Sequence, residues 1–214
     1  MSKTSELIFA PESDQPVRYI ERTRSYYLGL GYENPYVWAH YLETPFHSLQ
    51  KPLNQSVLGL ITTAVPFDVS KGPQGPGAPY NAAAKFYQPY QKPSNIDLDL
   101  RIAHVGIDRK NANMEDSNCW FPMEAAKQAV QSGRVKALSP HLYGLPTNRS
   151  QRHTLEIDAP LILEMLRTDK VDAAVLIPNC PICHQSQSLL ARHLEANGIA
   201  TVVMGAAKDI VEYC

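Results

Sequence analysis

One stretch near the carboxyl end constrains the fold of this chain more than any other. Residues 171–177 (VDAAVLI) form an apolar run typical of a buried strand, and Pro178-Asn179 is a turn signal. A helical pattern follows over residues 182–197. The sequence therefore predicts a strand, a tight turn and a helix, with Cys180 in the turn and Cys183 in the first helical turn.

This placement of the two cysteines predicts thiol chemistry. The first backbone N–H groups of a helix lack partners and carry the positive end of its dipole. A thiolate is stabilised there, so we expect Cys180 to be an accessible nucleophile with a lowered pKa. Cys183 lies three positions further on, faces Cys180, and is placed to resolve it as a disulfide.

Alternating strand and helix patterns predict an α/β domain. We expect strands at residues 56–64, 100–107, 135–138, 171–177 and 201–204, and helices at residues 121–130, 153–168, 182–197 and 206–213. Such alternation is typical of a parallel sheet covered on both faces. The predicted fold is three-layered, with a mostly parallel, flavodoxin-like sheet.

Three regions are expected along the chain. Residues 1–16 form a flexible tail, and residues 17–55 form a helix and a proline-punctuated arm that wraps over the domain or over a second copy. Residues 56–214 form the α/β domain. Within it, residues 65–95 form a long loop rich in proline and glycine, a kind of segment that is often functional.

Composition excludes several classes of function. With 20 basic and 21 acidic residues the net charge is −1, which gives no electrostatic footprint for nucleic acid. No apolar run approaches the ~20 residues that span a bilayer, and residues 1–15 lack a signal-peptide core. Four cysteines in 214 residues do not form a disulfide framework, so we expect a cytoplasmic protein.

Candidate catalytic residues follow the expected strands, because ligands of parallel α/β sheets bind at the carboxyl ends of strands. His141 is a candidate general acid or ion-pair partner of the Cys180 thiolate, and Asp108 a proton donor or orienting group. The alternatives are a loop histidine bonded to backbone and a turn-capping aspartate.

Four further residues are candidates for substrate binding. Thr62 and Thr63 end the first core strand and are placed to hydrogen-bond a substrate carboxylate, although threonine is common at strand ends. Asn179 lies in the cysteine turn. His104 falls within an apolar strand, where a satisfied core histidine is the alternative.

Other interpretations of the CxxC pair remain open. The cysteines could be small buried hydrophobic residues. Residues 180–184 also match the C-x-x-C-H pattern of c-type haem attachment. Zinc would need further ligands, with His184 and one of Cys119, His141 or His104 nearby. No GxGxxG or Walker-type loop is present, and we predict no metal or cofactor in this chain.

Several segments, in this order, carry a resemblance to a known family. They are residues 17–27 with Trp38-Ala39-His40, Lys51-Pro52-Leu53 ahead of Thr62-Thr63, residues 104–108, Phe121-Pro122, residues 133–143 and the strand–cysteine–helix unit. With these residues the chain resembles the selenoprotein B family of glycine, betaine and sarcosine reductases and the related D-proline reductase subunit.

The resemblance implies a reductase. In that family a selenocysteine ends the corresponding strand in a UxxCxxC pattern, which places Cys180 at the selenocysteine, Cys183 at the next cysteine and Ser186 at the third. A cysteine-containing, thiol-dependent subunit that cleaves the C–N bond of a small amino-acid-like substrate is implied. The family's reductases work with a partner subunit that bears a pyruvoyl group, where the substrate amine forms a Schiff base.

The expected partners follow from this chemistry. They are a small-molecule substrate, a thioredoxin-type electron donor and further subunits in a homo- or hetero-oligomer, with no nucleic acid and no membrane. Two alternative functions stay open. One is a non-catalytic, partner-binding subunit of a reductase complex, and the other is a metal-binding or redox-sensing CxxC protein.

Overall fold

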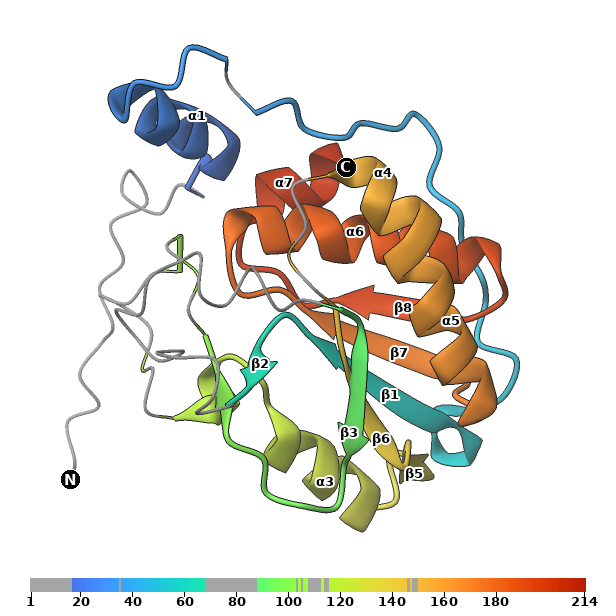
Figure 1. Ribbon diagram of the computed structural model, residues 1–214. Helices are drawn as coiled ribbons and strands as arrows, with labels where there is room; N and C mark the ends of the chain where they lie inside the picture. The colour runs from blue at the N-terminus through green and yellow to red at the C-terminus, as the bar shows by residue number, and fades with distance from the viewer. Residues whose placement is uncertain are drawn as a thin grey trace, which may run out of the picture.

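A three-layered α/β domain is seen in the computed structural model (Figure 1). The structure describes residues 17–34, 36–67, 88–102, 104, 106–107, 113, 116–145, 147 and 150–214. Helices α4 to α7 lie on one side of the central sheet and α3 lies on the other. The predicted fold class is therefore confirmed.

The central sheet is mostly parallel. Its strands are β1 (Val57–Thr62), β3 (Tyr90–Pro93), β5 (Ala137–Leu138), β6 (His141–Gly144), β7 (Ala173–Ile177) and β8 (Ala200–Val203). They lie in the order β3-β6-β1-β7-β8, with β5 beside the start of β1, and β3 is the antiparallel edge strand.

The order of the parallel strands creates a preferred place for a ligand. Counted along the chain, β1, β6, β7 and β8 lie in the order 2-1-3-4, which is the beginning of the flavodoxin-like order. The direction of winding reverses between β1 and β7. Ligands of such sheets bind beyond the carboxyl ends of the strands at this switch point.

The predicted helices are also confirmed. They are α1 (Tyr19–Gly29), α3 (Met123–Gln131), α4 (Gln151–His153), α5 (Ala159–Thr168), α6 (Pro181–Ala196) and α7 (Lys208–Tyr213). A π-helical turn, Thr154–Asp158, joins α4 to α5. Single 3₁₀ turns lie at Leu53–Gln55 and Ser117–Cys119.

Adjacent residues of the central strands face opposite layers. Ile61 and Leu176 pack with α5 and α6, whereas Leu60 and Ile177 pack with the α3 side. This alternation is the period of two that a pleated strand imposes on its side chains. Each fully buried Leu or Ile side chain contributes roughly 1.5–3 kcal/mol, so the two faces hold the sheet between its helices.

The strand predicted at residues 100–107 is wrong for most of its length. Among its described residues, 100–102, 104, 106 and 107, only Leu100–Arg101 (β4) is a strand, and it pairs antiparallel with Val65–Pro66 (β2) in a separate two-stranded sheet. The chain then turns at Gly106, where a Cβ atom would lie 2.9 Å from Pro181 Cδ. The apolar pattern reflects burial of Leu100 and Ile102 in the core on the α3 side instead of a place in the central sheet.

Residues 36–52 form an extended arm along the α6 side of the domain (Figure 1). The Ala39 N–H donates to Gln185 Oε1 over 2.7 Å, and the Arg192 guanidinium lies 3.9 Å from the centroid of the Tyr41 ring. The expected tail at residues 1–16 and the central part of the expected loop, residues 68–87, lie outside the described residues. No helix in the described part of the chain has the length and apolarity needed to cross a membrane.

The close packing of β3 on β6 leads to a prediction about the free energy of unfolding. A Cβ atom at Gly144 would overlap the ring of Tyr90, whose hydroxyl donates to the Ala64 carbonyl over 2.6 Å. We expect Gly144→Ala to lower the free energy of unfolding, measured by urea denaturation, by roughly 1–3 kcal/mol. Gly29→Ala is the matched control, because no atom lies within 4 Å of its Cβ position. Equal stability of the two variants would contradict the packing.

Candidate active site

The cysteine turn joins the carboxyl end of β7 to the start of α6. Cys180 is the N-cap residue, with extended backbone angles, and its Sγ accepts a hydrogen bond from the Cys183 N–H over 3.3 Å. Pro181 occupies the first helical position, where its missing N–H costs nothing. The predicted strand, turn and helix are thus confirmed.

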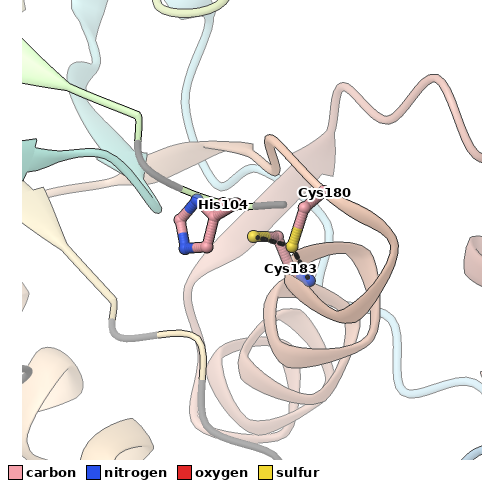
Figure 2. Close-up of side chains that lie close together, drawn as sticks. All are labelled: His104, Cys180 and Cys183. Atoms are coloured by element: carbon pink, nitrogen blue, oxygen red, sulfur yellow. Dashed lines mark hydrogen bonds between the residues drawn. The ribbon is translucent and has the colours of Figure 1, made fainter. Parts of the chain in front are cut away.

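The two sulfurs are in contact, as the three-residue spacing predicts. Cys180 Sγ lies 2.7 Å from Cys183 Sγ, and both residues are free thiols (Figure 2). Such proximity is what disulfide formation requires, because the second sulfur must reach the first without rearrangement of the backbone.

His104 and Thr147 complete the cluster around the thiols. Thr147 Oγ1 lies 3.0 Å from Cys183 Sγ and 2.9 Å from His104 Nε2. One donor atom from each of His104, Cys180 and Cys183 lies within 4.8 Å of the others. Sequence reasoning missed Thr147, because the strand that it follows, β6, was not predicted at residues 141–144.

Asn179 attaches the cysteine turn to the end of β1. Its N–H and its Nδ2 each donate to Thr63 Oγ1 over 3.1 Å, and Nδ2 also lies 3.4 Å from Thr62 Oγ1. All three residues are buried. The structure therefore brings these predicted residues together as a brace for the turn, and their binding of a substrate stays a prediction.

The pKa shifts of the two cysteines differ from the predicted ones. Burial opposes ionisation of Cys183, but hydrogen bonding from Cys180 and the charge and hydrogen bonds of His104 and Thr147 lower its pKa. Burial and the negative charge of Cys183 raise the pKa of Cys180, which two backbone N–H groups only partly offset. The prediction of a low pKa at Cys180 is therefore wrong.

Both thiols are also more buried than predicted. Cys180 is 6% exposed and Cys183 is fully buried. Tyr36 and Trp38 of the arm pack against them, with their rings edge to face at 5.0 Å between centroids. An isolated strand–turn–helix unit would expose its N-cap, and the cover comes from a segment more than 140 positions away in the sequence.

His184, the last residue of the C-x-x-C-H pattern, is engaged elsewhere. Its Nδ1 lies 2.7 Å from the Cys180 carbonyl oxygen, and its Nε2 accepts from the Ala207 N–H over 3.0 Å. Burial lowers its pKa, which keeps the ring neutral. Nδ1 is thus engaged with the N-cap of α6 and Nε2 with the turn before α7, so His184 contributes no ligand to the thiol cluster.

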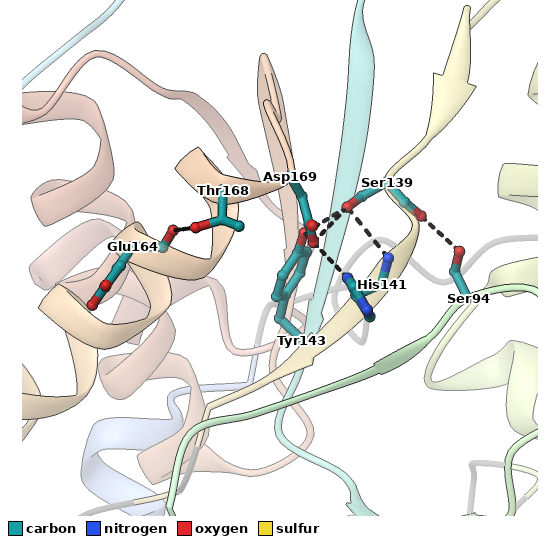
Figure 3. A network of polar contacts seen from close by, with 7 residues as sticks. All are labelled: Ser94, Ser139, His141, Tyr143, Glu164, Thr168 and Asp169. Carbon is teal, nitrogen blue, oxygen red and sulfur yellow. Dashed lines mark hydrogen bonds and ion pairs between the residues drawn. The ribbon is translucent and has the colours of Figure 1, made fainter.

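His141 does not lie beyond the end of a strand, and this placement is a correction. It is the first residue of β6, and its Nδ1 lies 2.8 Å from Asp169 Oδ2 in the turn that leads into β7 (Figure 3). Tyr143 and Ser139 hydrogen-bond the same carboxylate. Pro140, which has no N–H, interrupts the line of β5 and β6, so the strand predicted at residues 135–138 resumes at His141.

Among the described residues, the hydrogen bonds of His141 with Asp169 are therefore separate from the thiol cluster. They lie at the amino end of β7, whereas the two cysteines follow its carboxyl end. Asp108, the other predicted catalytic residue, lies outside the described residues.

The fold and the site together define a class of protein. It is a flavodoxin-like α/β protein with a CxxC dithiol at the switch point between β1 and β7.

Comparison with known proteins points to a relative. The chain is 31% identical over 114 residues to D-proline reductase subunit gamma of Acetoanaerobium sticklandii. The match covers 53% of this chain and 47% of that protein, so the chain spans about half the length of this relative. No family model and no solved structure matches. The identity supports a relationship with the reductase subunit.

The aromatic cover over the thiols can be tested by alkylation. Trp38→Ala removes one ring of the cover, and such aromatic contacts contribute about 1 kcal/mol or more. We expect iodoacetamide to modify Cys180 roughly tenfold faster, as followed by peptide mass spectrometry. Phe46→Ala is the matched control, since Phe46 is an arm residue that is 83% exposed. A Cys180 rate that is equal in the two variants would show that the rings do not limit access.

Proposed function

We propose that the chain is a thiol-dependent subunit of a reductase complex that cleaves a C–N bond in a small amino-acid-like substrate. The observation that carries the proposal is the contact of Cys180 and Cys183 at the carboxyl edge of the sheet, with sulfurs 2.7 Å apart. The relationship to a protein named as a D-proline reductase subunit supports the reaction class.

Cys180 is the attacking sulfur in this proposal. It is the only one of the pair with exposed surface, and its Sγ already accepts a hydrogen bond at the helix start. Its proton passes to Cys183 across the short contact. The Cys180 thiolate then attacks the substrate carbon, so that a C–S bond forms and the C–N bond breaks, with the electron pair leaving on nitrogen, which takes the proton that Cys183 received.

Cys183 completes the reduction. Its thiolate attacks the Cys180 sulfur, so that the S–S bond forms and the C–S bond breaks, with the electron pair passing to carbon, which takes the second proton. The dithiol loses two electrons, and the substrate gains one C–H and one N–H bond. One proton comes from the pair and the other from solvent, and a thioredoxin-type dithiol donor then reduces the disulfide.

His104 takes the proton-transfer role that the sequence assigned to His141 or Asp108. Its ring belongs to the thiol cluster, and its Nε2 lies 2.9 Å from the Thr147 hydroxyl. Asn179 with Thr62 and Thr63 positions Cys180, because these side chains bond to one another.

The substrate carbon must be activated, because an amine is a poor leaving group. The resemblance implies a partner subunit with a pyruvoyl group, which supplies an electrophilic carbonyl for the substrate amine. Within this chain, Tyr36 and Trp38 cover Cys180 and must move before a substrate can reach it. Docking of the partner subunit at the arm is a suitable trigger for that movement.

A non-catalytic subunit is the second candidate, and the burial of both thiols favours it. The two functions differ in whether the dithiol is oxidised and reduced again in each catalytic cycle. In a catalytic subunit, the oxidised chain is a substrate of thioredoxin, whereas a permanently covered pair is not.

Reduction of the oxidised full chain by thioredoxin, thioredoxin reductase and NADPH tests this difference. We expect one equivalent of NADPH to be consumed per chain, and none by Cys180→Ser or Cys183→Ser. Cys119→Ser is the matched control, because Cys119 is an exposed free thiol outside the cluster. No NADPH consumption by the wild-type chain would support the non-catalytic subunit.

Turnover can be measured in the complex isolated from its native cells, with D-proline, glycine, betaine and sarcosine as candidate substrates and dithiothreitol as the reductant. We expect Cys180→Ser to lower kcat/KM by about a thousandfold or more, because it removes the nucleophile. Turnover that survives this substitution would end the proposal.

A further inference from the structure

We propose that the reduced thiol pair and His104 form a binding site for a thiophilic divalent cation such as Zn²⁺. The inference goes beyond the proposed function, although it uses the same thiols, because it rests on the donor set and not on turnover. Figure 2 shows the imidazole beside the two sulfurs, and all three residues are buried. Two cysteines and one histidine are a ligand set that zinc prefers.

The separation of the donor atoms fits a metal ion. One donor atom of each residue lies within 4.8 Å of the other two. Tetrahedral zinc with Zn–S bonds of about 2.3 Å holds two sulfurs ~3.8 Å apart. The sulfurs must therefore separate by about 1 Å from their present 2.7 Å, an adjustment within reach of a side-chain rotation at the N-cap.

The charge of the pair also favours a cation. All three residues are buried, with His104 3% exposed. Two thiolates in contact repel each other in such a place, and a divalent cation bound between them offsets that repulsion.

The fourth coordination position stays open in the described residues. His184 uses both ring nitrogens elsewhere, and Cys119 lies in an exposed 3₁₀ turn beside Asp116. The Thr147 hydroxyl is near the cluster, but it is a neutral and weak ligand for zinc. Three protein ligands and one open position are typical of zinc sites that bind water or a small molecule.

Metal binding and disulfide formation exclude each other at this site. A sulfur that is bound to zinc is neither free to attack a carbon nor to form the S–S bond. Zinc should therefore protect Cys180 and Cys183 from oxidation and stop the thiol cycle until a chelator or a competing thiol removes it.

Direct binding to the full chain tests the inference. The protein is reduced, stripped with a chelator and titrated anaerobically with Zn²⁺ against a chromophoric competitor, and with Co²⁺ for its absorption spectrum. We expect one ion per chain and a sulfur-to-cobalt charge-transfer band. His104→Ala and Cys183→Ser should each weaken binding by more than about 100-fold, the upper range for the loss of an outer-shell partner. Cys119→Ser should leave it unchanged.

A second measurement needs no variant. Zn²⁺ should slow alkylation of Cys180 and Cys183 in the wild-type chain, with exposed Cys119 as the internal control. Failure of the reduced wild type to bind the ion, or equal binding by the oxidised chain, would overturn the inference. If the chain is reduced by thioredoxin but binds no metal, only the metal-site inference is wrong. If it binds metal but is not reduced by thioredoxin, only the proposed function is wrong.

Discussion

The site depends on the hydrogen bonds that tie Asn179 to the end of β1. Two parallel strands bring their carboxyl ends to one edge, and this brace holds the turn after β7 against Thr63. Because Cys180 is the next residue, its sulfur is held where the winding of the sheet reverses. The contact of the two sulfurs follows from this placement and from the spacing of the helix.

Burial of Cys180 and Cys183 affects how the two thiols ionise. Gly106 lies against Pro181 on one side, and Tyr36 and Trp38 pack on the other. In a site removed from water, ionisation of one thiol opposes ionisation of its neighbour, because the two negative charges would repel each other. The same enclosure limits access to the sulfurs, since Cys180 and Cys183 are both buried.

Sequence patterns predicted those parts of the molecule that depend on local periodicity. The strand at β7, the helix α6 and the contact between Cys180 and Cys183 follow from spacing along a single segment. The strand expected at residues 100–107 was wrong because an apolar run signals burial, and burial in the core on the α3 side gives the same pattern as burial in a strand of the sheet. His141 was misplaced because Pro140 interrupts a strand without ending it.

The sequence by itself determined the fold class and the presence of a dithiol at a helix start, since both arise from residue order over short distances. Only the tertiary structure decided that His104 and Thr147 join the thiols, that His141 does not, and that the arm covers them. These contacts join residues 36 or more positions apart. Long-range packing selects such neighbours through the burial of the whole domain, which no local pattern encodes.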